Sequence, residues 1–132
     1  MLLGIGVDII GIENFRRIVD KSGERFINRI FTPAEIQYCD NKVHRFQHLA
    51  ARFTCKEAIS KALKMAWSDG LNWKDIEVLN DKNGQPKVKL RGRAKKTADY
   101  LEVEDIQLSL SHCPDYAVAM AVILRGDRNG AD

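Results

Sequence analysis

The sequence has few of the features that mark membrane, secreted or disulfide-bonded proteins. No apolar run in the 132 residues approaches the roughly 20 needed to cross a bilayer. The amino end, Met1 to Gly6, has neither the basic leader nor the cleavage site of a secretory signal. Cys39, Cys55 and Cys113 are odd in number and widely spaced, so they predict neither a disulfide framework nor a zinc site. We therefore expect a cytoplasmic protein with no membrane partner and with reduced, mostly buried thiols.

Internal repeats, low-complexity tracts and linkers are also missing before a short polar tail. Residues 1–125 are therefore predicted to form one domain, and residues 126–132 the C-terminal tail. With 45% hydrophobic and 30% charged residues, the chain has the balance of one soluble domain with a substantial core. The net charge of +3 is mildly basic and indicates an anionic partner without identifying it.

Hydrophobic periodicity and turn residues predict helices and strands in a mixed order. Leu2 to Ile10 is almost continuously apolar and rich in β-branched residues, which favours a buried strand. Thr32-Pro33-Ala34-Glu35 has the residues of a capping box, so a helix is expected to begin there, and this structural role explains those residues. The other expected elements are a helix over about 12–21 ended by Gly23, a long helix over about 43–67, strands 76–79 and 87–90 around Asn83-Gly84, a helix over 93–101, and strands 106–111 and 116–124 joined around Pro114.

This order, with helices early and hairpins late, favours an α+β domain over a doubly wound parallel sheet. The expected architecture is an antiparallel sheet packed against the long helix.

The long helix changes its apolar side along its length. Its first half places Phe46, Leu49, Ala50 and Phe53 on one face, whereas its second half places Cys55, Ile59, Ala62, Leu63 and Ala66 on roughly the opposite face. Glu57, Lys61 and Lys64 therefore continue the face that begins as core. An ordinary surface pair of Glu57 and Lys61 at four-residue spacing is the simpler explanation, and it is worth only about 0.2–0.5 kcal/mol.

Two further residues stand out for their positions. Asp8 lies inside an apolar run, where an unpaired buried charge is expensive, although a cap or strand-end role also accounts for it. Ser111-His112 ends an alternating strand, a place where histidine is often structural. Two carboxylates, a lysine and a histidine are nevertheless what metal-assisted phosphoryl transfer requires, and magnesium takes one or two protein carboxylates and fills its shell with water and phosphate oxygens.

Three segments in order resemble the motifs of holo-acyl-carrier-protein synthases. They are Gly6-Val7-Asp8, the segment Arg52-Phe53-Thr54-Cys55-Lys56-Glu57-Ala58-Ile59-Ser60-Lys61-Ala62, and Ser109-Leu110-Ser111-His112. The resemblance runs from Leu3 to about Leu124. It implies the 4′-phosphopantetheinyl transferase fold and transfer of phosphopantetheine from coenzyme A to a serine of an apo-acyl carrier protein, which releases adenosine 3′,5′-bisphosphate and serves fatty acid, and so lipid, biosynthesis.

The resemblance also implies roles for individual residues. Asp8 and Glu57 would bind magnesium (Mg2+), Lys61 would meet phosphate or assist proton transfer, and His112 would contact the coenzyme A phosphates. Glu57 could also accept the serine proton, directly or through water, and the sequence leaves that assignment open. The expected catalytic set is therefore Glu57, Lys61 and His112.

The basic residues have two expected destinations, because coenzyme A is polyanionic and carriers of this class are acidic. Coenzyme A is assigned to residues on the long helix and the late strand: Arg45, Arg52, Lys61, Lys64, Ser111 and His112. Carrier docking is assigned to residues on or shortly after the first helix: Arg16, Arg17, Lys21, Arg25 and Arg29. Asn14 departs from the arginine common in relatives, and Arg16 or Arg17 is expected to substitute. The basic cluster over residues 87–96 is interpreted as a solvated face.

Two rival functions are compatible with the same residues. A basic nucleic-acid-binding module would use the cationic surface, but Trp67 and Trp73 lie near a helix end and a loop, and no aromatic-rich strand accompanies the basic residues. No nucleic acid partner is therefore expected. A magnesium-dependent hydrolase of coenzyme A or a nucleotide would use water as nucleophile in place of a carrier serine.

The late strands predict a partner for the sheet. Tyr116–Leu124 is apolar on both faces, and Ile106, Leu108 and Leu110 add a second apolar row. One face of a small antiparallel sheet normally meets water and carries polar residues. Either the domain's own helices bury both faces, or neighbouring subunits cover one of them. The resemblance implies a homotrimer with active sites between subunits.

Overall fold

The computed structural model describes residues 1–66 and 70–126 as an α+β arrangement. The elements in chain order are β1 (Leu2–Gly11), α1 (Ile12–Ser22), α2 (Glu24–Ile30), α3 (Pro33–Asp40), α4 (Arg45–Ala62), the 3-10 turn η2 (Trp73–Asp75), β2 (Ile76–Asn80), β3 (Pro86–Leu90), α5 (Gly92–Tyr100), β4 (Asp105–His112) and β5 (Tyr116–Leu124). Among the helices of these residues, none is long and apolar enough to span a membrane.

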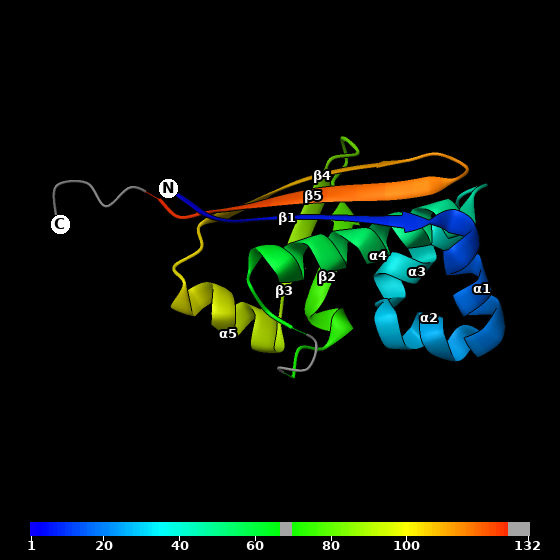
Figure 1. The fold of residues 1–132 in the computed structure, drawn as a ribbon, viewed down its shortest axis with the longest axis horizontal. Coiled ribbons are helices and arrows are strands. Elements are labelled where there is room, and N and C mark those ends of the chain that lie inside the picture. Colours follow the sequence, from blue (N-terminus) through cyan, green and yellow to red (C-terminus); the bar gives the residue numbers. More distant parts are fainter. Residues whose placement is uncertain (67–69, 127–132) are drawn as a thin grey trace, which may run out of the picture.

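An antiparallel sheet of order β1-β5-β4 forms one layer, and α4 runs along one of its faces (Figure 1). Helices α1, α2 and α3 gather at one end of α4, and α5 lies toward the other end with the β2–β3 hairpin between them (Figure 1). The expected antiparallel sheet packed against a long helix is confirmed.

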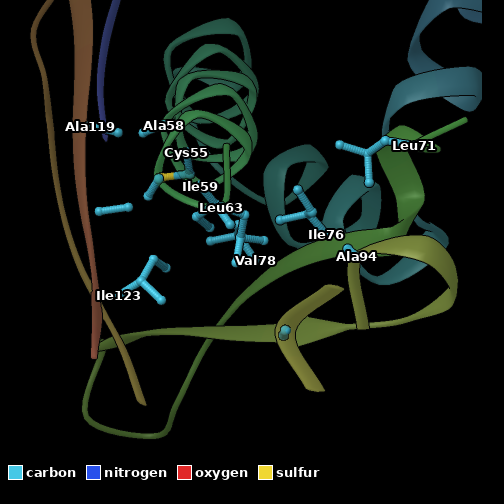
Figure 2. Close-up of a cluster of buried hydrophobic side chains, with 13 residues drawn as sticks. Cys55, Ala58, Ile59, Leu63, Leu71, Ile76, Val78, Ala94, Ala119 and Ile123 are labelled. Carbon is cyan, nitrogen blue, oxygen red and sulfur yellow. The ribbon is translucent and has the colours of Figure 1, made fainter. Parts of the chain in front are cut away.

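Two separate clusters form the core, which explains why the apolar side of α4 changes. The first half of α4 buries Leu49 and Ala50 with α1, α2 and α3. The second half buries Cys55, Ile59 and Leu63 against β2, α5 and the sheet (Figure 2). Ala66, which was expected on the second face, lies past the end of the helix and is exposed.

The sequence overestimates the length of the long helix. Helix α4 begins at Arg45 and ends at Ala62, whereas the sequence predicts an end at Trp67, which lies outside the described residues. Lys64 adopts a left-handed φ of 59°, and the Met65 and Lys64 amides donate to the Ser60 and Lys61 carbonyls at 2.9 and 3.0 Å. These two bonds form a Schellman motif that closes the helix without the usual glycine.

Helix α2 is missing from the sequence prediction. Gly23 ends α1 as expected, with φ 69° and its amide donating to the Val19 carbonyl at 2.6 Å. A second helix starts at once with Glu24 and buries Ile27 and Ile30. Those two apolar residues are the signal that could have predicted it, although seven residues are too few for a clear period.

The hairpin and the capping box are confirmed. Val78 pairs with Val88, and the Asp81 carboxylate accepts from the Asn83 and Gln85 amides at 2.8 and 2.9 Å to close the connecting turn. Thr32 Oγ1 accepts from the Glu35 amide at 3.2 Å while Glu35 Oε1 accepts from the Thr32 amide at 2.8 Å. All three cysteines are free thiols, with Cys39 and Cys55 buried and Cys113 exposed.

Candidate active site

Two glycines of β1 allow α4 to touch the strand's backbone. A Cβ atom on Gly4 would collide with the Ala62 carbonyl oxygen, and one on Gly6 with the Ala58 carbonyl oxygen. Each two-residue step along β1 therefore matches about one turn of α4, since two strand residues and four helix residues both span about 6–7 Å. The same face of β1 continues to Asp8, which is thereby held against the helix.

Asp8 forms an ion pair with α4. Lys61 Nζ lies 3.0 Å from Asp8 Oδ1 and also donates to the Val7 carbonyl at 3.1 Å. The Asp8 side chain is only 19% exposed, whereas that of Lys61 is 51% exposed. The acid inside the apolar run is thus a paired residue at the edge of the sheet, with its carboxylate still reachable from solvent.

Glu57 lies one helical turn before Lys61 and on the same side of α4. The pair of Asp8 and Glu57 is the expected metal site. In residues 1–66 and 70–126, no three His, Cys, Asp or Glu side chains gather into a ready-made metal cage. A site with two carboxylates suits magnesium, which leaves its other positions to water and phosphate oxygens.

Lys56, next to Glu57, is completely buried and has an ionic partner that the sequence did not indicate. Its Nζ lies 2.9 Å from Glu35 Oε1 and donates to the Ile76 and Trp73 carbonyls at 2.5 and 3.1 Å. Burial lowers the pKa of Lys56, and the Glu35 carboxylate opposes that shift. The pair joins the start of α3, the middle of α4 and the η2–β2 segment.

The same network extends to Glu77. Its carboxylate accepts from Thr32 Oγ1 at 2.5 Å and from Arg91 at 2.9 Å, while Glu35 Oε2 accepts from the Val78 amide at 2.9 Å. Burial acts to raise the pKa of Glu77, but the hydrogen bonds from Thr32 and Arg91 outweigh it, and the pKa is lowered. The capping box alone therefore does not explain Glu35, because its carboxylate also holds the middle of the fold together.

His112 is positioned by the first turn of α4. Its Nδ1 lies 2.9 Å from Gln47 Oε1, and its ring lies 4.7 Å from the ring of His48. Burial, Arg52 and His44 lower the pKa of His112. Burial, and to a smaller extent the charge of His112, lowers the pKa of His48 to about 4.

Ser111 and His112 do not share a site within the chain. Alternate residues of β4 face opposite sides of the sheet, so His112 points toward α4 while Ser111 is exposed on the outer face. The register also separates His112 from Asp8. His112 pairs with Ala117 and Asp8 with Ala119, so the two residues lie two strands and two residues apart, roughly 12 Å along the sheet.

The basic residues assigned to coenzyme A lie in different settings. Arg52 is buried, with its guanidinium 4.1 Å from the centre of the Tyr38 ring and a hydrogen bond to the Asn80 side chain. Arg45 forms ion pairs with Asp40 at 2.6 Å and Glu24 at 3.5 Å. Lys64 is exposed past the end of α4.

A groove lies beside Arg45 and Gln47. Its volume is about 450 Å³, and it is lined by Ile12, Arg16, Val43, His44, Arg45, Phe46, Gln47 and Pro114. The Arg16 guanidinium lies 4.4 Å from the centre of the Phe46 ring at this groove. It is therefore an apolar groove with cationic walls.

The residues assigned to carrier docking are all exposed. Arg16, Arg17 and Lys21 project from α1, and Arg25 and Arg29 from α2. Glu13 lies 3.9 Å from Arg17, a surface pair of little energetic weight. The basic cluster over residues 87–96 is exposed as expected, with Arg91 and Lys95 paired to Glu77 and Asp99.

The chain belongs to the 4′-phosphopantetheinyl transferase superfamily, whose family model matches residues 4–121. It is similar to holo-[acyl-carrier-protein] synthases over nearly all of its length. That of Geobacter sulfurreducens is 43% identical over 125 residues, which cover 95% of this chain and 99% of the relative. The family expected from the sequence motifs is therefore confirmed.

Solved structures agree with this assignment. The holo-[acyl-carrier-protein] synthase of Neisseria meningitidis has a TM-score of 0.86 and 29% identity, covering 95% of this chain and 100% of that one. The Helicobacter pylori enzyme, solved in complex with coenzyme A, has a TM-score of 0.80 and 30% identity, with 91% and 99% covered. The fold class expected from the sequence is that of these enzymes.

Proposed function

We propose that the chain is a holo-[acyl-carrier-protein] synthase that transfers 4′-phosphopantetheine from coenzyme A to a serine of an apo-acyl carrier protein. The observation that carries the proposal is the match of 95% of the chain to synthases at 43% and 44% identity, with a coenzyme A complex among its structural neighbours. The Asp8–Lys61 pair, one turn of α4 from Glu57, supplies the charged groups that phosphoryl transfer uses.

The transfer exchanges one phosphorus–oxygen bond for another. The carrier serine Oγ bonds to the phosphorus on the pantetheine side of the pyrophosphate, and the bond from that phosphorus to the bridging oxygen breaks. Adenosine 3′,5′-bisphosphate leaves with the bond's electrons, and the serine proton passes to a base. Lys61, which is held by Asp8 and the Val7 carbonyl, would meet a phosphate oxygen. Glu57 is the carboxylate nearest to Lys61 along α4 and can accept the proton directly or through water.

Asp8 and Glu57 would hold magnesium. The ion would neutralise the pyrophosphate charge and stabilise the leaving phosphate. Two carboxylates fit that role, because a substrate pyrophosphate supplies the remaining anionic oxygens. The partial exposure of Asp8 leaves its carboxylate accessible to an ion that arrives with the substrate.

Coenzyme A binding is assigned to the cationic groove and the neighbouring His112. Arg45 lines the groove directly, and His112 is held by Gln47, which also lines it. Arg52 supports this region from within the fold, since its guanidinium is buried against Tyr38. Lys64 is exposed past the end of α4, and Ser111 is exposed on the outer face of the sheet. They would contact coenzyme A where the bound ligand extends beyond the groove onto these surfaces.

Carrier docking is assigned to the exposed cations of α1 and α2. An acidic carrier would approach this surface by long-range attraction, with the association rate weakened by salt. Arg16 joins this surface to the groove through its contact with Phe46, so docking would bring the carrier serine toward the coenzyme A region. The carriers of fatty acid biosynthesis, in the cytoplasm, are the expected substrates.

The outer face of the sheet supports a homotrimer. Ile5, Val7 and Ile9 are 60%, 57% and 63% exposed, and Val118 and Met120 are 36% and 46% exposed on the neighbouring strand. Within residues 1–66 and 70–126, the helices cover the opposite face of the sheet, and this apolar surface is exposed. A closed ring of subunits would bury it, as exposed apolar patches of this kind commonly mark interfaces.

One assay separates this proposal from its rivals. The protein is incubated with coenzyme A, magnesium and an apo-carrier, and the carrier's intact mass is measured. A gain of one phosphopantetheine supports the transferase. Cleavage of coenzyme A with an unmodified carrier would indicate the hydrolase, and no reaction would leave the nucleic-acid-binding alternative. An Asp99→Asn variant is the matched control, because its carboxylate is exposed on α5 and its pairing with Lys95 is worth little.

A further inference from the structure

His112 ends β4 and meets the first turn of α4 through one specific bond. Its Nδ1 lies 2.9 Å from Gln47 Oε1. An amide oxygen can only accept a hydrogen bond, so Nδ1 carries a hydrogen and donates it. In a neutral imidazole with Nδ1 protonated, Nε2 holds a lone pair. The contact therefore fixes both the ring's tautomer and its orientation.

The other faces of the His112 ring are crowded by groups that disfavour a second proton. The His48 ring packs edge-on at 4.7 Å, and His48 in turn meets Tyr38 at 6.0 Å. The charge of Arg52 and the side chain of His44 act in the same direction as burial. Lys42 adds to the positive charge around His48. The free protein therefore holds His112 neutral near pH 7.

A phosphate oxygen cannot hydrogen-bond to a bare Nε2, because both atoms would offer only lone pairs. A proton on Nε2 would turn that repulsion into a charge-assisted bond. The negative charge of a bound phosphate would also offset the nearby cations that keep the ring neutral in the free protein.

We propose that Gln47 is a positioning residue for coenzyme A binding, which holds Nδ1–H of His112 so that Nε2 faces a phosphate, and that His112 takes up one proton as coenzyme A binds. This inference rests on the proposed function, since it requires His112 to meet a coenzyme A phosphate. The proton comes from solvent and no covalent bond to the ligand forms. The affinity for coenzyme A then falls as pH rises above neutrality.

The tautomer can be tested without any activity measurement. With three histidines in the chain, ring ¹⁵N spectra of the wild-type protein can be assigned by single His→Gln variants. At pH 8 the His112 signals are expected to report a protonated Nδ1. A protonated Nε2 would overturn the inference at this first step.

Proton uptake is tested with adenosine 3′,5′-bisphosphate as the probe. Calorimetry in two buffers of different ionisation enthalpy gives the number of protons bound with the ligand. The inference predicts uptake approaching one proton near pH 7.5 and a higher His112 pKa in the complex. Tight binding with neither change would contradict it.

Two variants of Gln47 separate positioning from simple packing, because they move the His112 pKa in opposite directions. Gln47→Leu removes the acceptor of the Nδ1–H bond, so the His112 pKa should fall. The Michaelis constant for coenzyme A should rise about tenfold, while that for the carrier stays unchanged. Gln47→Glu adds a negative charge beside Nδ1–H, so the His112 pKa should rise by about 1–3 units and the pH dependence of coenzyme A affinity should shift upward with it.

Gln37→Leu, an exposed glutamine of α3, is the matched control and should change neither value. Equal effects of Gln47→Leu and Gln47→Glu on the pKa would mean that packing alone is involved. If the nucleotide binds with proton uptake but the carrier's mass never changes, the proposed transferase function fails while the role of Gln47 stands.

Discussion

The two faces of the β1-β5-β4 sheet are built from different residues. The face toward α4 carries Gly4, Gly6 and the small residues Ala117, Ala119 and Ala121. The outer face carries larger apolar residues from the same two strands, and they are exposed: Ile5, Val7, Ile9, Tyr116, Val118 and Met120.

The difference teaches how one strand serves two purposes. Small residues on the inner face let α4 approach the backbone of β1, and this close approach sets Asp8 beside Lys61. Large residues on the outer face are exposed in the described part of the chain, as the proposed assembly with a covering partner requires. The inner face would thus build the site and the outer face the assembly.

The largest expected effect comes from filling the inner face. Gly6→Val would drive side-chain atoms into the Ala58 carbonyl, so α4 must move away from β1 or the fold must open. We expect the free energy of unfolding to fall by about 3 kcal/mol or more, measured by urea denaturation, with loss of transfer. Ile5→Val on the outer face is the control, and a Gly6→Val protein as stable as this control would refute the close-packing account.

Making the outer face polar should instead break the assembly. Met120→Gln lies on β5 between two buried alanines and should leave the fold of the chain intact, because its side chain is already 46% exposed. Light scattering of the wild-type protein should give three times the chain mass of 15.0 kDa, and the variant should give a smaller species with reduced transfer. A fully active wild-type monomer would end the trimer proposal while leaving the transferase proposal intact.

A smaller effect is expected on the carrier surface, which lies outside both faces of the sheet. Changing Arg17, Lys21 and Arg25, which do not line the coenzyme A groove, to glutamate should raise the Michaelis constant for the carrier about tenfold, because charge complementarity chiefly sets the association rate. The constant for coenzyme A should change much less. The matched control changes the exposed Lys87, Lys89 and Lys96 to glutamate, and an equal effect of both triple variants would remove the docking assignment.

The smallest effect concerns the pH dependence of stability, and it arises from His48 in the first turn of α4. Burial and His112 lower the His48 pKa from 6.5 to about 4, so the folded chain favours the neutral ring. Below pH 6.5 the unfolded chain therefore binds more protons than the folded chain. The free energy of unfolding falls for this reason as pH falls from 6.5 toward 4. Denaturation at pH 7.5 and 5 should show a larger drop for the wild-type protein than for His48→Gln. Equal drops would contradict the lowered pKa.

The sequence predicted the elements whose residues carry strong local signals. Three such signals were sufficient to predict the local structure, because each depends on neighbours within a few residues. They are the capping box of Thr32 and Glu35, the turn at Asn83-Gly84 and the change of face along α4. The motif around Asp8 and Glu57 also indicated the family correctly. The metal, carrier and coenzyme A assignments remain predictions.

The rest depended on partners far along the chain. Nothing near Lys56 reveals that its ammonium meets Glu35, 21 residues away, in the buried centre of the fold. Lys64 and Glu102 end helices with a left-handed φ of 59° where a glycine would have given the signal. Ser111 and His112 are adjacent in sequence, but the alternation of β4 sends them to opposite faces.

Magnesium dependence tests the central claim that the inner face holds Asp8 against α4 to build the reaction site. Transfer to an apo-carrier is measured by intact mass over a series of magnesium concentrations, for the wild-type protein, Asp8→Ala, Glu57→Ala and the control Asp99→Asn. We predict that each of the first two variants loses most transfer at limiting magnesium while unfolding as cooperatively as the control. Near-normal turnover of Asp8→Ala at limiting magnesium would contradict the account.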